Sequence, residues 1–270
     1  MNILIQLTES CNLQCRHCHG SYGPGGKSME FETAEAVVGN ISSKTKQVIL
    51  SGGEPLYKPD IFWHTMDYIA ANRHRFPDAV VSVQTSGFWA RNGESAYRIL
   101  KRLCDKGVDR LILTGLDNYH AEQGLDLRSL DESESPFAYA MERLGSPIAV
   151  VREIPGQGIM PFGRAKELPD GELAKKSRCE LPWGFENNLT VDINGQLYPC
   201  CWKVTPSMGS AKGKSIEKLV RKAMSDKIFH ALERGGPMMA AIKLGAYREE
   251  AKPRYRHECR MCEEIFRGMR

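Results

Sequence analysis

The sequence lacks the long apolar runs and terminal signals that would place it in a membrane or direct it to secretion. No apolar stretch approaches the ~18 residues that a spanning helix needs, and the N-terminus (MNILIQLTES) has neither a basic region nor a long apolar core. A strong charge of one sign is also missing, because 37 Lys and Arg against 33 Asp and Glu give a net charge of +4. These absences exclude membrane-spanning, collagen-like and disordered classes. We therefore expect a cytoplasmic globular protein whose partners include neither a membrane nor nucleic acid.

Short β-branched runs alternate with longer helical stretches through the first 155 residues. This alternation is typical of β-α units around a mostly parallel sheet, which is an α/β fold. The expected strands span residues 2–7, 47–50, 79–84, 110–114 and 148–153, and the expected helices 32–40, 59–73, 93–106 and 135–144. A closed eight-fold barrel needs ~250 residues, so we expect a partial, abridged β/α barrel of the TIM type. A sixth strand hidden in residues 188–193 is the alternative to an abridged barrel.

After residue 156 the pattern changes to a hairpin followed by a helix. Two short strands, 188–193 and 196–200, flank Asn194-Gly195, a pair that predicts a type I′ hairpin turn. Apolar spacing predicts one amphipathic helix over 215–233, which begins at a Ser215 cap and ends at Gly235-Gly236-Pro237. We expect two domains: a partial barrel over residues 1–165 and a smaller domain of hairpin plus helix over 166–270.

Nine cysteines in a reducing compartment indicate metal binding or catalysis more often than disulfides. Cys11, Cys15 and Cys18 follow the first strand directly, at the edge of the sheet where β/α barrels carry their active sites. Structural zinc usually takes four ligands in C-x2-C pairs, whereas C-x3-C-x2-C leaves the fourth corner of an iron–sulfur cube without a protein ligand. A zinc loop completed by His17 or His19 is the alternative.

The second motif, Ser51-Gly52-Gly53-Glu54-Pro55, follows the second strand at the same edge. Two glycines let the backbone approach a ligand closely, and a carboxylate behind them can pair with an ammonium group. Paired glycines alone mostly make turns. The position of this motif one β-α unit after the cysteine loop is what links the two to one site.

Together these motifs resemble the signature of the radical S-adenosylmethionine (SAM) superfamily. The resemblance implies that Cys11, Cys15 and Cys18 hold a 4Fe–4S cluster, with SAM on the fourth iron through its amino and carboxylate groups. It further implies that the amino group of SAM is held by Gly52, Gly53 and Glu54.

Three further segments are expected to lie near the same SAM site. Thr85 and Ser86 belong to a turn, Gln84-Thr85-Ser86-Gly87, that resembles a family element and implies contacts to polar groups of SAM. Asp117 and Arg152 fall on the same rim and are candidates for contact with SAM or substrate. A capped loop or a surface ion pair is the alternative for each of these positions.

The remaining cysteines suggest a second site. The spacing C-x15-G-x4-C followed by a distant C-x2-C resembles the Twitch domain, the shorter relative of the SPASM domain, and implies an auxiliary 4Fe–4S cluster on Cys179, Cys200, Cys259 and Cys262. Four-cysteine zinc is the alternative. Residues 161–165 resemble a GRA element that precedes such domains, which supports the boundary near residue 165. We interpret Cys104 as a core residue. We interpret Cys201 as a spectator; an alternative cluster ligand and a donor of a hydrogen atom to a substrate radical are the other interpretations.

The resemblance implies an oxidoreductase that cleaves SAM reductively and abstracts hydrogen from an unactivated C–H bond, using an external electron donor such as flavodoxin or ferredoxin. The auxiliary cluster favours oxidation, crosslinking or epimerisation of the substrate. We favour a ribosomally synthesised peptide as substrate over a small polyol or aminocyclitol, because an open barrel admits a peptide more easily. A zinc-binding scaffold without catalysis is the competing class.

Overall fold

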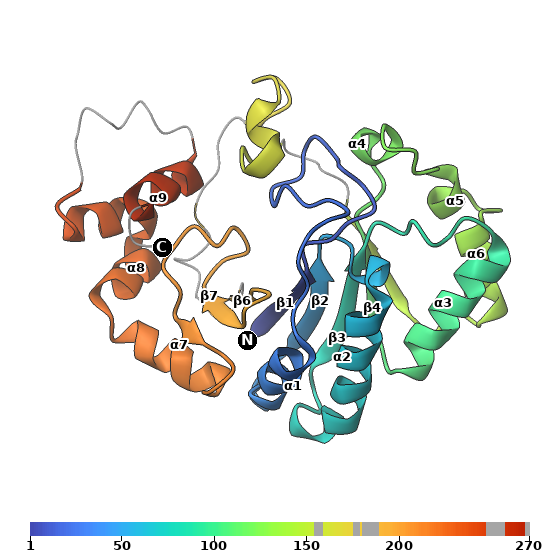
Figure 1. The fold of residues 1–270 in the computed structure, drawn as a ribbon, viewed down its shortest axis with the longest axis horizontal. Coiled ribbons are helices and arrows are strands. Elements are labelled where there is room, and N and C mark those ends of the chain that lie inside the picture. Colours follow the sequence, from blue (N-terminus) through green and yellow to red (C-terminus); the bar gives the residue numbers. More distant parts are fainter. Residues whose placement is uncertain (154–158, 175–178, 180–188, 247–256, 268–270) are drawn as a thin grey trace.

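A single mixed sheet organises the chain (Figure 1). The computed structural model describes residues 1–153, 159–174, 179, 189–246 and 257–267. Five parallel strands run in the order β5-β4-β3-β2-β1. Their bounds are Asn2–Thr8 (β1), Gln47–Gly52 (β2), Val80–Thr85 (β3), Arg110–Leu113 (β4) and Ala149–Arg152 (β5). The five strands expected from the sequence are confirmed to within two residues at each end, and the sheet is open.

The sheet continues past β1 into the C-terminal half of the chain. Strand β6 (Leu189–Val191) lies parallel to β1, and β7 (Gln196–Tyr198) and β8 (Gly209–Ser210) follow antiparallel. The sixth parallel strand is therefore present, but it pairs with β1 and leaves β5 at the open edge. The division into two domains at residue 165 stays a prediction.

The expected type I′ turn between β6 and β7 is wrong. The Asp192 carbonyl accepts the N–H of Gly195 at 2.9 Å, and Gly195 (φ 78°) lies in the left-handed region whereas Asn194 does not. The cause is the Asp192 side chain, whose Oδ1 accepts the N–H groups of Asn194 (2.9 Å) and Gln196 (2.8 Å). An aspartate that binds the backbone two residues ahead favours this longer turn.

Four helices cover the outer face of β1 to β5, as the sequence predicts. Two short helices and three 3-10 turns, η1 to η3, complete this half. The helices are α1 (Phe31–Gly39), α2 (Pro59–Asn72), α3 (Gly93–Asp105), α4 (Asn118–Ala121), α5 (Arg128–Asp131) and α6 (Pro136–Arg143), and the turns are η1 (Pro55–Tyr57), η2 (Arg73–Arg75) and η3 (Gly163–Glu167). Fully buried side chains such as Phe62, Met66 and Leu100 face Ile3, Ile5 and Leu50 of the sheet in one core.

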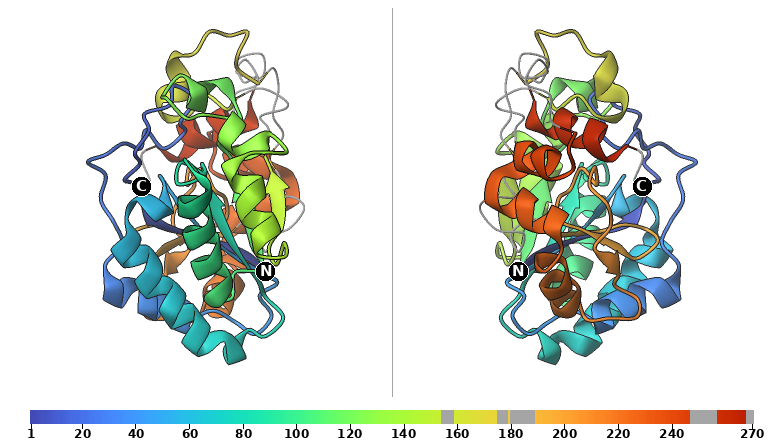
Figure 2. Two further views of the ribbon diagram at one scale, coloured as in Figure 1. Left: turned by 90° about the vertical axis from the view of Figure 1, so that its right-hand side faces the viewer. Right: turned by 90° about the vertical axis from the view of Figure 1, so that its left-hand side faces the viewer.

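Three helices form the opposite end of the molecule: α7 (Ile216–Met224), α8 (Lys227–Lys243) and α9 (Glu258–Phe266). In the left view of Figure 2, α3 and α6 (green) face the viewer, and in the right view α7 to α9 (orange to red) do so. None of the helices in the described ranges is long and apolar enough to cross a membrane.

The single helix expected over 215–233 is wrong in one respect. It breaks after Met224, because the Asp226 side chain accepts the N–H groups of Ile228 (2.8 Å) and Phe229 (3.2 Å) and starts α8. The helical conformation does stop at Gly235 and Gly236, as expected, and a further helical segment within the bounds of α8 begins beyond them. Ser215 does cap α7, as expected.

Candidate functional site

The carboxyl ends of β1 to β5 surround a cavity of about 560 Å³. It is lined by all the candidate residues of the first half except one: Cys11, Cys15, Cys18, Gly52, Gly53, Thr85, Ser86, Asp117 and Arg152. Glu54 is the exception. The sequence therefore predicts correctly which loops meet, because parallel strands bring their carboxyl ends to one edge of a sheet.

The three cysteines lie on a loop that folds back on itself after β1. The N–H of Cys11 donates to Gly23 at 3.0 Å, and Ser10 Oγ donates to Gly26 at 2.6 Å. Burial, with a smaller contribution from the charges of neighbouring thiols, raises the pKa of Cys11 and of Cys15 to about 12. A metal ion shared by these thiols would displace their protons, because metal-bound cysteine is a thiolate.

Gly52 and Gly53 bring β2 into backbone contact with the start of the cysteine loop. The N–H of Gly53 donates to the Thr8 carbonyl at 2.7 Å. A Cβ atom on Gly52 would lie 2.4 Å from the Thr8 oxygen, and one on Gly53 would lie 2.4 Å from the Ser10 oxygen. Gly52 also has φ 156°. The contact therefore requires glycine at both positions.

Glu54 is buried beneath the cavity wall, with 1% of its surface exposed. Oε1 accepts from the Thr85 hydroxyl (2.8 Å) and the Leu56 N–H (3.2 Å), and Oε2 accepts from the N–H and the hydroxyl of Ser86, both at 2.7 Å. Burial raises the pKa of this carboxyl group in spite of these hydrogen bonds. Glu54 thus joins the turn after β2 to the turn after β3, and its expected contact with an amino group stays a prediction.

Gln84 connects three strands along the cavity. Its Oε1 accepts from the Ser51 hydroxyl at 2.8 Å, and its Nε2 donates to Glu153 Oε2 at 3.3 Å. Glu153 and Tyr22 line the cavity as well, although no motif identified them. Their positions at strand ends or in the cysteine loop are the signal that could have found them.

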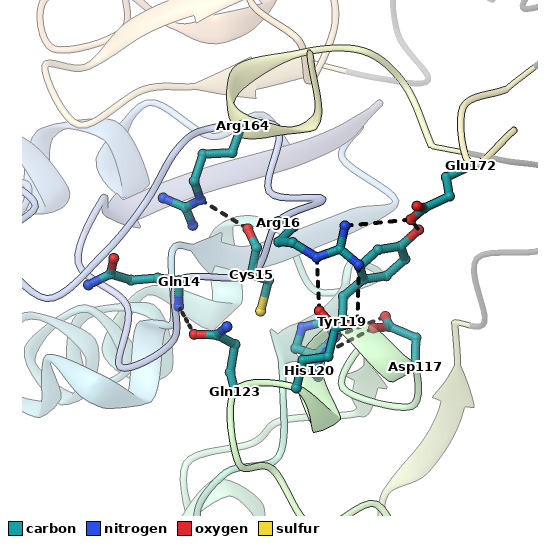
Figure 3. A network of polar contacts seen from close by, with 10 residues as sticks. Gln14, Cys15, Arg16, Asp117, Tyr119, His120, Gln123, Arg164 and Glu172 are labelled. Carbon is teal, nitrogen blue, oxygen red and sulfur yellow. Dashed lines mark hydrogen bonds and ion pairs between the residues drawn. The ribbon is translucent and has the colours of Figure 1, made fainter. Parts of the chain in front are cut away.

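Asp117 and two histidines, His17 and His120, line the same cavity. Figure 3 shows Asp117 beside His120. Asp117 Oδ1 accepts the N–H of His120 at 3.0 Å, and Oδ2 is hydrogen-bonded to His120 Nδ1 at 2.9 Å and lies 3.8 Å from His17 Nε2. Burial opposes the charge of Asp117, but the hydrogen bonds and charge of His120 outweigh it and lower the pKa. The His17 ring packs on Tyr119 with a centroid distance of 4.7 Å.

Cys15, His17 and His120 also form a group whose ligand atoms all lie within 4.8 Å of one another. This geometry would suit a single metal ion held by one thiolate and two imidazoles. His19 points elsewhere, toward Trp202 at a ring distance of 4.9 Å. Of the two histidines considered for a zinc site in the cysteine loop, His17 therefore lies close to Cys15, whereas His19 is directed toward Trp202.

Arg152 lines the cavity, and Arg16 belongs to the cysteine loop. Arg152 donates to the Leu130 carbonyl at 3.2 Å and pairs with Asp131 at 3.4 Å, so the ion-pair alternative describes part of its environment. Arg16 binds Glu122 with two hydrogen bonds of 3.0 and 3.1 Å, and Figure 3 shows its guanidinium directed toward Glu172 as well. Arg16 thus ties the cysteine loop to α4.

The second set of cysteines lies on α9, beside it and after β7. Cys259 and Cys262 are one turn apart on α9, where Cys262 is buried. The N–H of Cys179 donates to Glu258 of the same helix at 2.6 Å. Cys200 follows β7 and packs against the core. Whether these four thiols share one metal site stays a prediction, as does the spectator role of Cys201; Cys104 lies on α3 against the core, as expected.

Comparison with known proteins identifies the first half. The sequence model of the Radical SAM superfamily matches residues 5–132. The chain is 43% identical over 63 residues to an AdoMet-dependent heme synthase of Methanosarcina barkeri, covering 22% of this chain and 18% of that protein. It is 26% identical over 169 residues to a PqqA peptide cyclase of Methylorubrum populi, covering 58% and 41%. The chain thus spans less than half the length of these two relatives.

The fold also resembles a solved structure, that of BtrN in complex with AdoMet and 2-DOIA. The TM-score is 0.53 at 14% identity, and the match covers 87% of this chain and 88% of that one. Likeness at this identity concerns the fold alone. Residues 5–132 therefore form a radical SAM domain.

Proposed function

We propose that the protein is a radical SAM oxidoreductase whose first cluster is held by Cys11, Cys15 and Cys18. The observation that carries this proposal is the cavity on which the three thiols converge with Gly52 and Gly53. When bound and reduced, a 4Fe–4S cluster supplies one electron to the SAM sulfonium, which yields methionine and a 5′-deoxyadenosyl radical able to abstract hydrogen from an unactivated C–H bond.

The residues fit such a cofactor pair. Three thiols without a fourth cysteine in the loop leave one iron for an external ligand. The two glycines leave backbone open at the cavity wall, because their contacts with Thr8 and Ser10 exclude any side chain. A volume of about 560 Å³ falls within the ~300–1,000 Å³ of small-molecule sites.

The chain's own residues then bind, orient and shield. The backbone of Gly52 and Gly53 lines the wall where an ammonium group would be accepted, and Glu54 fixes Thr85 and Ser86 beside it. Asp117, kept ionised by His120, offers a negative wall, and the guanidinium of Arg152 offers a positive one. Leu13 and Tyr22 help to exclude water, which would quench a reactive intermediate.

Cys179, Cys200, Cys259 and Cys262 are proposed to hold an auxiliary 4Fe–4S cluster. The i, i+3 spacing of Cys259 and Cys262 on α9, with Cys179 bound to the same helix through Glu258, supports a shared site. A second cluster would take up the electron left on a substrate radical, which favours oxidation, crosslinking or epimerisation. A zinc ion on the same thiols is the competing assignment.

We favour a ribosomally synthesised peptide as the substrate. Similarity to a PqqA peptide cyclase over 58% of this chain supports this choice, and so does the open β5 edge of the sheet. A small polyol or aminocyclitol is the second candidate, supported by the fold likeness to BtrN, whose structure holds 2-DOIA. The electron donor is proposed to be a flavodoxin or a ferredoxin.

The metal content and SAM cleavage of anaerobically reconstituted protein test this function. The wild-type chain is expected to bind about eight irons, as two four-iron clusters require, and to form 5′-deoxyadenosine with dithionite and SAM. Cys15→Ala is expected to lose about four irons and all SAM cleavage, whereas Cys262→Ala loses the other four and keeps cleavage. Cys104→Ala is the matched control and keeps both properties.

Two results would contradict the proposal. Formation of 5′-deoxyadenosine by Cys15→Ala at the wild-type rate would remove Cys15 from the first site. Zinc in place of iron, with no cleavage by the wild-type chain, would support a zinc-binding scaffold instead.

A further inference from the structure

Arg164, on the 3-10 turn η3, contacts the cysteine loop at three points although about 150 residues separate them in the sequence. Its N–H donates to the Cys18 carbonyl at 3.1 Å. Its Nε donates to the Cys15 carbonyl at 3.0 Å, which Figure 3 shows, and its Nη2 donates to the Tyr22 carbonyl at 2.8 Å. Two of the three acceptors are the backbone of proposed cluster ligands.

The preceding residue, Gly163, fits closely against the same loop. It adopts φ 52°, in the left-handed region. A Cβ atom would lie 2.4 Å from the His19 carbonyl oxygen and 2.6 Å from that of Cys18. Glycine is therefore required for η3 to approach the loop closely enough for Arg164 to form its hydrogen bonds.

The guanidinium of Arg164 also brings a positive charge to the cavity. It lines the same wall as the cysteines, and its side-chain hydrogen bonds go to backbone carbonyls, which carry no formal charge. A cation so placed favours thiolates and any anionic group that they bind. Arginine suits this role better than lysine because its planar fork donates in two fixed directions at once.

The neighbours of Arg164 connect η3 to the C-terminal half. Lys166 pairs with Glu263 of α9 at 3.0 Å, and Phe162 stacks on Trp202, which follows Cys200 and Cys201. The segment from Phe162 to Lys166 thus lies between the two groups of cysteines and contacts both sides.

We infer that Arg164 is a positioning residue that holds the cysteine loop in its metal-binding shape and places a fixed positive charge beside it. The part of this inference that concerns a cluster rests on the proposed function. The part that concerns the loop does not, because it follows from the contacts of the chain alone.

The first experiment measures access to Cys15 in the full-length chain freed of iron. Cys15 is 4% exposed, so alkylation by iodoacetamide requires the loop to open. Arg164→Lys and Arg164→Gln each lose charged hydrogen bonds, and we expect alkylation of Cys15, mapped by mass spectrometry, to accelerate about tenfold or more. Lys166→Gln, on the same turn, is the matched control with an unchanged rate, and tryptophan fluorescence reports global unfolding in every variant.

If Arg164→Lys kept the wild-type alkylation rate, the inference would be overturned. A positive charge without the hydrogen bonds of the guanidinium would then be enough to hold the cysteine loop. Equal acceleration in Lys166→Gln would overturn it too, since η3 as a whole and not Arg164 would hold the loop.

The second experiment uses the reconstituted protein and measures the midpoint potential of the first cluster by EPR. Arg164→Gln is expected to have a more negative potential than Arg164→Lys, because the added electron loses a nearby cation. Equal potentials in the two variants would overturn the electrostatic part. A wild-type chain that binds no iron would refute the proposed function, and the alkylation result would still decide the role of Arg164 in the loop.

Discussion

Replacing Glu54 with glutamine is expected to lower the free energy of unfolding by about 1–3 kcal/mol at neutral pH, because a buried donor loses its acceptor. Glu54 Oε1 accepts from Thr85 and Leu56, and Oε2 accepts from the N–H of Ser86 at 2.7 Å. Glutamine keeps one oxygen and presents an NH2 group at the other position. That NH2 group would face the Ser86 N–H, two donors in contact at a site with 1% exposure.

The destabilisation is expected to shrink as pH rises. Burial raises the pKa of Glu54 above the ordinary value of 4.5. The folded chain then holds this proton more tightly than the unfolded chain, so stability falls as pH rises from the unfolded pKa through the folded one. The glutamine variant has no proton to lose at this position. The difference in the free energy of unfolding between wild type and Glu54→Gln therefore narrows as pH rises from the unfolded pKa of Glu54 to the folded one.

Urea unfolding of the iron-free chain, followed by tryptophan fluorescence between about pH 5 and pH 8, measures both effects. Glu35→Gln is the matched control, because Glu35 is partly exposed and pairs with His64 at 3.0 Å, and it should change stability by less than about 1 kcal/mol. An unchanged stability of Glu54→Gln at neutral pH would refute the reasoning about Ser86. A gap that widens with pH would refute the sign of the pKa shift.

Two further changes test local features. Asp226→Ala removes the acceptor for the N–H groups of Ile228 and Phe229 and should cost about 0.5–2 kcal/mol in urea unfolding; a cost near zero would mean that α8 does not depend on this cap. Asp117→Asn should make the free energy of unfolding depend less on pH below about pH 4. Burial opposes the charge of Asp117, but His120 outweighs it and lowers the pKa of Asp117. The ionised carboxylate therefore stabilises the wild type above the unfolded pKa, and this stabilisation is lost as pH falls through the folded pKa. An equally steep acid limb in the variant would contradict this.

The sequence predicted which loops of the first half form the site, because β-α alternation forces parallel strands whose carboxyl ends share one edge. Cys11, Gly52, Thr85 and Asp117 each lie at the end of a strand or in the loop after one, and all four line the same cavity. Hydrophobic periodicity was sufficient for this result, since it needs only the existence and order of the strands.

The errors arose where one side chain binds nearby backbone. Asp192 accepts two N–H groups and replaces the type I′ turn expected at Asn194-Gly195, and Asp226 accepts two more and divides the expected helix. Both aspartates compete with the regular backbone pattern from which the expectations came. The spacing of apolar residues carries no information about such hydrogen bonds between a side chain and the nearby backbone.

Glu54 and Arg164 show a second limit, which is tertiary. A motif indicated that Glu54 faces a ligand, which stays a prediction; its carboxylate also reaches Thr85 and Ser86, residues that the adjacent strand brings beside it. Arg164 was noted only as a boundary marker, and its hydrogen bond to Cys15 spans 149 positions. Both side chains act on the residues that line the cavity, and both do so through contacts that the sheet and its loops create. Spacing along the chain predicts the residues that meet a ligand, whereas the residues that hold them in place become visible only once the loops are packed.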